Sequence, residues 1–446
     1  MSVISQDGVP LHPAPRPIDH EAEVSSRTMR RVLTASFMGN FVEWFDYASY
    51  GYLATVIALV FFPEIAPSTA LLATYALFAI SFVIRPIGGI IWGGIGDRIG
   101  RRTALSASIL IMSGATTLIA LLPGYAQIGI WAPIALLLLR MVQGFSAAGE
   151  YAGAAAFISE YSPPGKRGFY TSLVPASTAA GLLAGSLMSA GLFALLDASQ
   201  IQSYGWRIPF LLAFPLGLVG LYIRLKLEDT PKFREMEARQ PLDAMPVGTI
   251  FRDYRRQIII AIGVTCLNAV GFYLILSYMP TYLITEMGLG ETESFIAVSL
   301  SLVVYCFSIF AMGRLSDRFG RKRVLITASV LFILLTLPLF RLLDGASFAT
   351  IVAVQIAFGI LLTVNDGTLP CFLTEIFPTK VRYSGFAFSF NTANAIFGGT
   401  APFVATWLIG VTGSKLAPAW YLVAIAVVAL IAMALARETK GQPLPD

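Results

Sequence analysis

The stretch G-G-I-G-D-R-I-G-R-R, from Gly93 to Arg102, is a charged turn between two long apolar segments, and the chain contains a second copy of it. The second copy, from Gly313 to Lys322, reads G-R-L-S-D-R-F-G-R-K. The aspartate, the last glycine and the basic residues recur at matching places, about 220 residues later in a chain of 446 residues. A repeat at half the chain length indicates a duplicated half.

A second pair of motifs repeats at nearly the same offset. S-E-Y-S-P at 159–163 and T-E-I-F-P at 374–378 are each followed by two basic residues. Two independent motif pairs at one offset are hard to attribute to chance. Glu160 and Glu375, within these motifs, stand at the ends of apolar segments, where a salt bridge to a basic loop is as reasonable as a functional role.

The composition places the chain in a membrane. Of its residues, 56% are hydrophobic and 13% are charged, and the mean hydropathy is +0.72, more than a water-soluble surface tolerates. The apolar runs suit helices of about 20 residues that cross a bilayer, whereas a barrel shows short alternating segments. The cysteines, Cys266, Cys306 and Cys371, lie in apolar segments without paired spacing, so we expect no disulfide and no metal site.

We therefore expect an all-α membrane protein with twelve transmembrane helices in two pseudo-symmetric six-helix bundles. The apolar spans lie at about 32–57, 70–96, 103–122, 131–160, 168–194, 207–226, 257–284, 293–315, 322–343, 348–374, 383–411 and 418–437. The expected division is an N-terminal tail at 1–28, a first bundle at 29–226, a central loop at 227–256, a second bundle at 257–437 and a C-terminal tail at 438–446.

The loops alternate sharply in charge. One set holds most of the basic residues, including both D-R-x-G-R turns, whereas the opposite set holds few beyond Arg207, Arg341 and Lys415. By the positive-inside rule we expect a multi-pass protein of the cell inner membrane with cytoplasmic N- and C-termini. Topology also accounts for the net charge of +5, so the lipid bilayer is the expected partner and a nucleic acid is not.

Ionisable residues within the spans are few, and each costs about 2.5 to 3.5 kcal/mol to insert at a helix centre, so each is a functional hypothesis. They are Glu43 and Asp46 in the first span, Arg85 in the second, Arg140 and Glu150 in the fourth and Asp366 in the tenth. Glu43 and Asp46 share a helix face, and two carboxylates that close cannot both ionise readily. One of them is expected to hold a proton, unless they pair permanently with Arg85 or Arg140.

Arg85 offers a planar guanidinium fork that suits a carboxylate, either that of a solute or that of Asp46 or Glu150. Asp366 is the one mid-span acid of the second half, where it either joins a proton path or satisfies backbone groups freed by a nearby glycine and proline. Both histidines lie in the N-terminal tail, so proton transfer within the membrane depends on carboxylates. The predicted proton-coupling residues are Glu43, Asp46, Glu150 and Asp366.

Aromatic residues are dense around these charges, and most of them are expected to be packing or interfacial residues. A few rings beside a buried arginine can nevertheless form a box for a zwitterion, in which the rings hold the ammonium and Arg85 holds the carboxylate. The predicted substrate-binding residues are Arg85, Trp44, Tyr47, Tyr273, Tyr278 and Asn391.

With its doubled G-x-x-x-D-R-x-G-R-[RK] turn, the chain resembles the major facilitator superfamily over its whole membrane portion. G-N-F-V-E-W-F-D-Y, F-V-I-R-P-I-G-G, Q-G-F-S-A-A-G-E-Y-A-G and N-A-I-F-G-G are similar to the metabolite:proton symporter family, and 206–233 and 272–283 look most like its proline/betaine branch. The osmosensory member of that branch has a long C-terminal coiled coil that is not found after Arg437 here, so regulation through such an extension is not expected.

The resemblance implies alternating access by two rocking bundles, driven by proton influx. The D-R-x-G-R turns are then cytoplasmic gates, whose charged residues make salt bridges or helix-end contacts in one state and lose them in the other. The predicted gate residues are Asp97, Arg98, Arg101, Asp317, Arg318 and Arg321.

Together these features predict a proton-coupled symporter for a small carboxylate-bearing solute, a zwitterion such as proline or glycine betaine. The alternative is a di- or tricarboxylate such as 2-oxoglutarate or citrate, for which Arg207 is a further cation if the cavity reaches the outer surface. A channel or a transporter-like receptor is less favoured, and antiport and uniport stay open. No nucleophile constellation or Walker motif occurs, so we expect no enzyme and no cofactor, and a monomer.

Overall fold

The computed structural model describes residues 26–163, 165–226 and 251–445, and within these ranges the chain is helical and has no strand. We call residues 26–226 the first half and residues 251–445 the second half. Most of the predicted N-terminal tail and of the predicted central loop, namely 1–25 and 227–250, lies outside the described residues.

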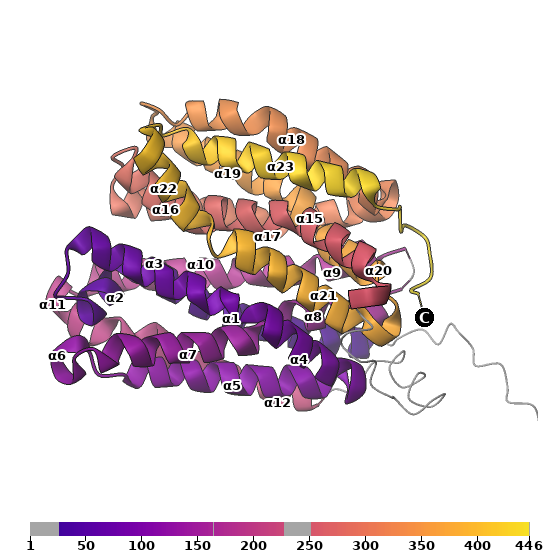
Figure 1. Ribbon diagram of the computed structural model, residues 1–446, viewed down its shortest axis with the longest axis horizontal. Helices are drawn as coiled ribbons and strands as arrows, with labels where there is room; N and C mark the ends of the chain where they lie inside the picture. The colour runs from indigo at the N-terminus through magenta and orange to yellow at the C-terminus, as the bar shows by residue number, and fades with distance from the viewer. Residues whose placement is uncertain (1–25, 164, 227–250, 446) are drawn as a thin grey trace, which may run out of the picture.

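The long helices of the first half run between the two ends of the molecule, and short helices lie between them at the ends (Figure 1). They are α1 (Ser26–Tyr52), α2 (Ala54–Phe61), α3 (Pro67–Val83), α4 (Arg85–Arg98), α5 (Arg101–Leu121), α6 (Tyr125–Ile128), α7 (Trp131–Ala147), α8 (Glu150–Tyr161), α9 (Arg167–Thr171), α10 (Leu173–Leu195), α11 (Ala198–Gln200), η1 (Ile201–Gly205) and α12 (Arg207–Leu225).

The second half repeats this plan. Its helices are α15 (Arg255–Phe272), η2 (Tyr273–Tyr278), α16 (Met279–Thr285), α17 (Glu291–Phe319), α18 (Arg321–Arg341), α19 (Phe348–Asp366), α20 (Leu369–Glu375), η3 (Thr379–Val381), α21 (Arg382–Ala393), η4 (Asn394–Gly398), α22 (Ala401–Thr412) and α23 (Ala417–Leu435).

Several consecutive helices together form one segment as long as the molecule, which we call a rod, and several of these rods are interrupted partway along their length. α3 gives way to α4 at Ile84, just before Pro86, and α7 gives way to α8 at Gly149. In the second half α15 passes through the π-helical turn η2 into α16, and α20 begins with Pro370 in its first turn. Proline and π-helical turns disturb the regular i→i−4 ladder, so these rods can bend where buried polar residues are placed.

Eleven rods of the described residues are long and apolar enough to cross a membrane. The twelfth, formed by α1 and α2, is more polar because α1 carries Arg30, Glu43 and Asp46. Glu43 and Asp46 are only 1% exposed, so the polar face of α1 points into the protein and not toward lipid. The prediction of twelve helices is therefore confirmed, and the most polar span is the one with two buried acids.

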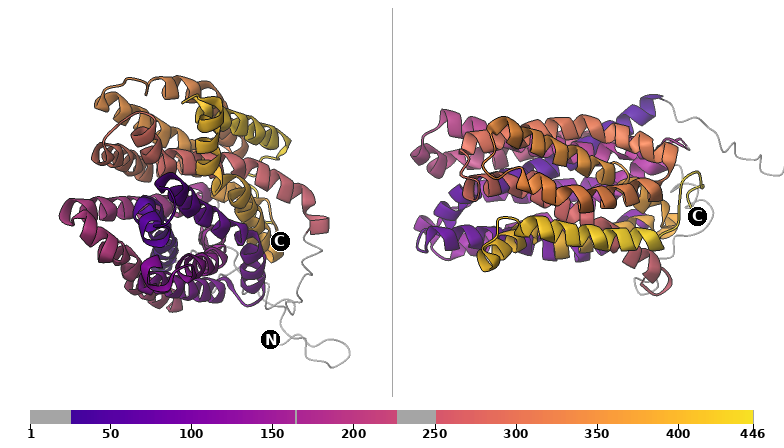
Figure 2. Two further views of the ribbon diagram at one scale, coloured as in Figure 1. Left: turned by 60° about the vertical axis from the view of Figure 1, so that its left-hand side comes forward. Right: turned by 90° about the horizontal axis from the view of Figure 1, so that it is seen from above.

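The two halves form two bundles that lie against each other, indigo to magenta and salmon to yellow in Figures 1 and 2. α10 packs on α17, and α4 packs on α21. Equivalent glycines allow a close approach between α4 and α21 and between α17 and α9. A Cβ on Gly93 would lie 2.5 Å from Ser384 Cα, and one on Gly313 would lie 2.5 Å from the carbonyl oxygen of Gly168, so only glycine fits at either place.

Both D-R-x-G-R turns lie at one end of the molecule, which we call the motif end, together with α9, α20 and the C-terminus (Figure 1). α2, α6, α11 and α16 lie at the opposite end. Gly100 separates α4 from α5 with φ 110°, and Gly320 separates α17 from α18 with φ 104°. Residues other than glycine rarely adopt this backbone conformation, which explains the glycine in each copy of the turn.

Candidate functional site

Arg85 and Glu43 form an ion pair inside the first half. Arg85 Nη2 lies 3.2 Å from Glu43 Oε1, and both residues are nearly inaccessible. The guanidinium also stacks on Phe82 and Tyr47, 4.2 Å and 4.6 Å from the ring centroids. Among the described residues, Arg85 Nε and Glu43 Oε2 have no hydrogen-bond partner. The pair is joined through one contact, and part of the fork is left available.

Asp46 belongs to a separate buried network. Its Oδ2 accepts a hydrogen bond of 2.6 Å from Gln143 Nε2 and lies 3.6 Å from Arg140 Nη1. Gln143 also accepts from Arg140 and donates to Thr116. Arg140 is 4.0 Å from the centroid of the Tyr50 ring. Of the two predicted alternatives for these acids, the geometry agrees with pairing, since Glu43 faces Arg85 and Asp46 faces Arg140.

Glu150 pairs with Arg224, an arginine that the sequence analysis does not include among the buried charges. Arg224 Nη1 donates to Glu150 Oε1 at 2.8 Å, Nη2 donates to Oε2, and Ser108 donates to Oε1 as well. Arg224 stands in the last turn of α12 but is only 2% exposed. Gly39 of α1 makes room for it, because a Cβ there would collide with the guanidinium.

Asp366, at the end of α19, has a different environment. Its Oδ1 accepts 2.7 Å from Asn268 Nδ2, and its Oδ2 accepts 2.6 Å from Tyr305 Oη. Within the described ranges no lysine or arginine forms an ion pair with it, although it is fully buried. Asp366 is thus a buried carboxyl group held by two neutral donors.

A small cavity connects Asp366 with the first half. Its lining includes Asp366 and Asn268 from the second half, and Trp44 and Tyr151 from the first half. Its volume is about 10 Å³, the room of roughly one water molecule. Among the described residues, Trp44 Nε1 and Tyr151 Oη have no hydrogen-bond partner. The acid and unpaired polar atoms of the opposite bundle therefore meet at one closed space.

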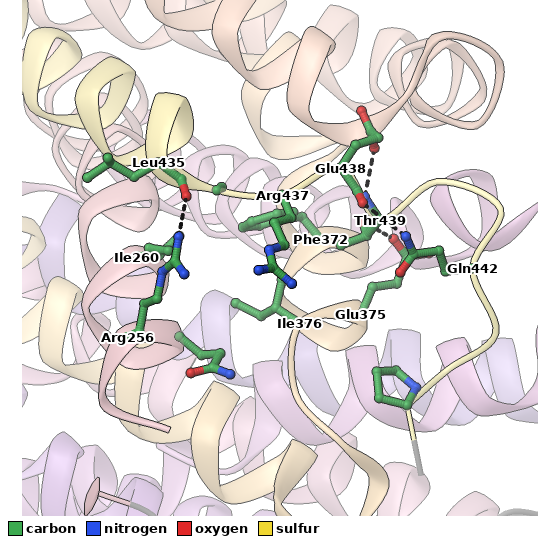
Figure 3. Close-up of a pocket in the computed structure, with 13 residues that line it drawn as sticks. Arg256, Ile260, Phe372, Glu375, Ile376, Leu435, Arg437, Glu438, Thr439 and Gln442 are labelled. Carbon is green, nitrogen blue, oxygen red and sulfur yellow. Dashed lines mark hydrogen bonds between the residues drawn. The ribbon is translucent and has the colours of Figure 1, made fainter. Parts of the chain in front are cut away.

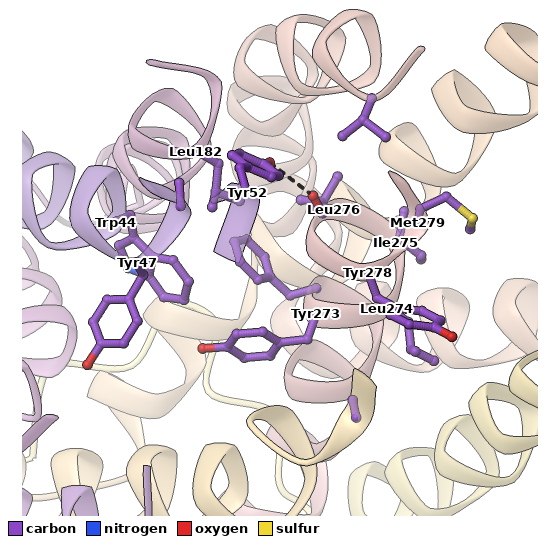
Figure 4. Close-up of a cluster of buried hydrophobic side chains, with 14 of the residues drawn as sticks. Trp44, Tyr47, Tyr52, Leu182, Tyr273, Leu274, Ile275, Leu276, Tyr278 and Met279 are labelled. Atoms are coloured by element: carbon purple, nitrogen blue, oxygen red, sulfur yellow. Dashed lines mark hydrogen bonds between the residues drawn. The ribbon is translucent and has the colours of Figure 1, made fainter. Parts of the chain in front are cut away.

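An aromatic cluster joins this space to Arg85. Trp44 lies 4.9 Å from Phe272, and Tyr273 lies 5.5 Å from Phe82, between ring centroids. Figure 4 shows Trp44 and Tyr47 on one side and Tyr273 on the other, with the Tyr273 hydroxyl directed toward the first half. That hydroxyl is buried and has no partner in the described part of the chain. Four of the predicted substrate-binding residues, Arg85, Trp44, Tyr47 and Tyr273, are therefore brought together.

The other two predicted substrate-binding residues lie elsewhere. The Tyr278 hydroxyl points away from the cluster in Figure 4 and accepts 2.9 Å from Thr406 of α22. Asn391 donates 2.7 Å to the carbonyl of Ala148 and 2.7 Å to that of Ala387, so it connects α21 to the junction between α7 and α8. Neither side chain faces the Arg85 cluster.

The end opposite the motif turns is closed over the cluster. Tyr52 donates to the carbonyl of Leu276 at 3.4 Å, and the Tyr75 and Thr281 hydroxyls lie 3.3 Å apart. Arg207 lies at this end, where it donates to the carbonyl of Leu122 at 2.7 Å. These contacts join the halves by neutral groups, and Arg207 caps a carbonyl of the first half.

The motif end is closed by a symmetric set of contacts. Asp97 Oδ2 accepts from the amide and the hydroxyl of Ser384, at 3.0 Å and 2.6 Å. The equivalent Asp317 accepts 2.9 Å from the amides of Gly168 and Phe169. Each aspartate thus binds first-turn amides of a helix in the other half, where a negative charge is favoured.

The motif arginines extend these contacts. Arg101 pairs with Glu160 at 3.0 Å, and Glu160 also pairs with Arg382 of the second half at 3.0 Å. Arg321 pairs with Glu375 at 3.1 Å, and Glu375 lies 3.9 Å from Arg167 of the first half. Four of the predicted gate residues therefore lie in networks that cross between the bundles. The side chains of the other two, Arg98 and Arg318, are exposed.

Comparison with known proteins gives consistent results for both halves. Residues 32–247 match the family model described as sugar (and other) transporter, and residues 262–445 match that of the Major Facilitator Superfamily. The structure of the proton:xylose symporter XylE bound to 6-bromo-6-deoxy-D-glucose has a TM-score of 0.80 at 17% identity, covering 94% of this chain and 98% of that one. This likeness shows the fold.

Sequence relatives are more informative. The glycine betaine/proline/ectoine/pipecolic acid transporter OusA of Dickeya dadantii is 38% identical over 440 residues, which is 96% of this chain and 87% of that protein. The proline/betaine transporter of Escherichia coli (strain K12) is 37% identical over 425 residues, or 93% and 85% of the two chains. This chain therefore belongs to the major facilitator superfamily of membrane transporters, among relatives named proline/betaine transporters.

Proposed function

We propose that the chain is a proton-coupled symporter that imports a zwitterion such as proline or glycine betaine by alternating access. The observation that supports this most is the Arg85 cluster. It offers a buried guanidinium with a free Nε, held by Glu43 through a single contact, beside aromatic rings from both halves. Such a site has one cation for a carboxylate and several ring faces for an ammonium.

In this proposal the solute lies between the bundles. Its carboxylate accepts from Arg85, and its ammonium lies against the ring faces of Trp44 and Tyr273, whose centroids are 6.0 Å apart. Because Trp44 and Tyr273 come from different bundles, the solute makes its full set of contacts only when the bundles close around it. Binding energy is then realised in the closed state, which favours the transition between the two open states.

The proton is assigned to Asp366. A charged carboxylate is costly in a closed, buried space unless a cation offsets it, and the donors here are the neutral side chains of Asn268 and Tyr305. Protonation removes that cost, so closing both ends favours the neutral acid. Glu43, Asp46 and Glu150 instead lie beside Arg85, Arg140 and Arg224, so protonation of any of them would leave a buried cation without its counter-charge.

The motif end is proposed to face the cytoplasm, with both termini there, because the basic loops gather at this end. The protein is proposed to work as a monomer in the cell inner membrane. Opening toward the cytoplasm requires Asp97 and Asp317 to leave the amides that they bind in the other half. These two residues, with Arg101 and Arg321, are thus the gate of the proposed cycle.

A di- or tricarboxylate fits this site less well. Its extra charge requires a second available cation, whereas Arg140 and Arg224 are engaged by acids and Arg207 binds carbonyls at the end of the molecule. A zwitterion requires only Arg85.

Uptake into proteoliposomes with an imposed inward proton gradient tests the proposal. Labelled proline, glycine betaine, 2-oxoglutarate and citrate are compared with and without a protonophore. We expect protonophore-sensitive accumulation of proline or glycine betaine and none of the carboxylates. Accumulation of 2-oxoglutarate or citrate in place of the zwitterions contradicts the solute assignment, and accumulation that survives the protonophore contradicts proton coupling.

A further inference from the structure

A cavity of about 440 Å³ lies at the motif end, away from the Arg85 cluster (Figure 3). It is bounded by the beginning of α15, the end of α20 and the chain that follows α23. Every described residue on its walls belongs to the second half, so the cavity lies within one bundle and not between the two. Cavities of about 300 to 1,000 Å³ are typical of small-molecule sites. This one therefore has the size of a ligand site separate from the proposed solute site.

Two arginines supply the available charge of the cavity. Arg437, two residues after α23, extends its guanidinium into the middle of the cavity in Figure 3, and it has no ion pair or hydrogen bond in the described part of the chain. Arg256, in the first turn of α15, donates only to the carbonyl of Leu435, at 3.5 Å, which is the long limit for such a bond. Both side chains are exposed, so their other donors are open to a ligand.

The acids on the walls do not neutralise these arginines. Glu375 forms an ion pair with Arg321 at 3.1 Å, and Glu438 accepts 2.8 Å from the amide of the same residue. Among the described residues neither carboxylate pairs with Arg256 or Arg437. The carboxylates are thus engaged while the guanidinium groups are not, and this arrangement favours an anionic ligand.

Much of the remaining wall is apolar. It includes Ile260 of α15, Phe372 and Ile376 of α20, and Leu435 at the end of α23. A small inorganic ion bound by the arginines would leave this surface uncovered. An apolar wall beside two cations therefore suits a molecule that has an anionic head and an apolar or ring-shaped body.

The head that suits two arginines is a phosphate monoester. At pH 7 it carries about 1.5 to 2 negative charges and three acceptor oxygens on one group. A guanidinium fork binds such oxygens through two parallel hydrogen bonds. A single carboxylate carries one charge and two oxygens, so it matches only one of the two forks.

From these features we propose that the cavity is a binding site for an amphipathic organic phosphate. Arg256 and Arg437 hold the phosphate, and Ile260, Phe372 and Ile376 cover the apolar body. Two sources share this chemistry, a water-soluble nucleotide and a membrane lipid with a phosphate head. None of the predicted solute-binding or proton-coupling residues lines the cavity, so the proposal does not depend on the proposed transport.

Titration of purified protein in detergent tests the site without a transported solute or a gradient. The probes are ADP, dioctanoyl phosphatidic acid and inorganic phosphate, and binding is measured by calorimetry. We expect ADP or phosphatidic acid to bind at least tenfold more tightly than inorganic phosphate, because only these two cover the apolar wall. Tighter binding of ADP assigns a soluble source, and tighter binding of phosphatidic acid assigns a lipid. Equal dissociation constants for all three probes, or no binding, overturn the proposal.

Substitutions locate the binding. Arg256→Gln and Arg437→Gln each remove a charge-assisted contact, so each should raise the dissociation constant of the tightest probe about tenfold. Both arginines are exposed, and unchanged unfolding temperatures verify that the variants fold. The control is Arg341→Gln, an exposed arginine in the last turn of α18, which should stay within about twofold of the parent.

Two outcomes separate this site from the proposed function. Binding that neither Arg256→Gln nor Arg437→Gln weakens overturns the site even if a probe binds tightly. Probes that fail to bind a protein that still accumulates zwitterions count against the site alone. Failed uptake by a protein that binds a probe through these arginines counts against the proposed function alone.

Discussion

The two halves of the molecule share a fold but treat their buried acids differently. Each of the three buried acids within the spans of the first half has its own arginine, in the pairs Glu43–Arg85, Asp46–Arg140 and Glu150–Arg224. In the second half Asp366 has only the neutral donors Asn268 and Tyr305. The duplication therefore preserved the helices and the gates while the electrostatics of the two bundles diverged.

This difference indicates a division of labour between the bundles. Neutralising an acid that faces an arginine would leave the arginine unpaired in a buried site, which is costly. An acid between neutral donors can gain or lose a proton without that cost. The first half is thus suited to bind a solute that has a fixed charge, and the second half is suited to bind and release a proton.

The largest expected effect comes from Asp366→Asn. The asparagine keeps the size and hydrogen bonding of the protonated acid but cannot release a proton, so protonophore-sensitive accumulation should be lost entirely, while solute counterflow should continue within about threefold. Uptake and counterflow in proteoliposomes measure the two activities. The control is Asp344→Asn, an exposed acid of the same half, and persistent accumulation in Asp366→Asn would assign the proton to another carboxylate.

A smaller effect, on stability, sharpens the contrast between the halves. Glu150→Gln leaves Arg224 buried without a counter-charge and should lower the free energy of unfolding by about 3 to 5 kcal/mol. Asp366→Asn should cost less than about 1.5 kcal/mol, because its partners are neutral. Unfolding measurements in detergent compare the two single variants. The double variant Glu150→Gln/Arg224→Met is expected to regain much of the stability that Glu150→Gln loses. Equal costs for the two single variants contradict the comparison.

Arg85→Lys tests whether the first half recognises the solute. Lysine keeps the positive charge but loses the planar fork and its stacking on Tyr47 and Phe82, so the dissociation constant of the solute should rise about tenfold. Binding is measured by calorimetry, with Arg207→Lys as the matched change at the end of the molecule. An unchanged dissociation constant places Arg85 outside the solute site.

The smallest effect concerns the gates, where the halves are alike. Asp97→Asn and Asp317→Asn each replace a carboxylate by a neutral amide and so weaken the hydrogen bonds that it accepts across the junction. Each variant should therefore slow net transport by several-fold with little change in solute binding. The two variants should agree within about twofold in initial uptake rate, whereas Asp197→Asn, an exposed acid at the other end, should have no effect. A large difference between the gates means that the symmetry of the contacts is not functional.

The fold follows from the sequence with few additional assumptions. Long apolar runs require helices in a membrane, and the doubled turn requires a repeat, so twelve helices in two bundles were predictable and are confirmed. α1 was the hardest span to find by hydropathy, because its polar residues reduce its apolar character. It was predictable because Glu43 and Asp46 lie within an otherwise apolar run.

The site was predictable only in part. The sequence identifies which charges are buried but not which acid meets which arginine, because that depends on how the helices cross. Arg224 was missed since it stands at the end of an apolar run, where an arginine normally reaches the bilayer surface. Tyr278 and Asn391 were grouped with Arg85 by residue type, but the π-helical turn η2 rotates Tyr278 toward Thr406, and Asn391 binds carbonyls. Such rotations are set by tertiary packing.

The paired glycines of the motif end bear on how well the membrane stays sealed. Gly93 meets Ser384, and Gly313 meets Gly168, at distances that exclude even a methyl group. Backbones this close leave no room for a water molecule at either contact, so each contact seals its part of the junction between the bundles. A carrier differs from a leak because its cargo crosses the membrane only when the bundles move. The gradient that drives transport is therefore not dissipated between cycles.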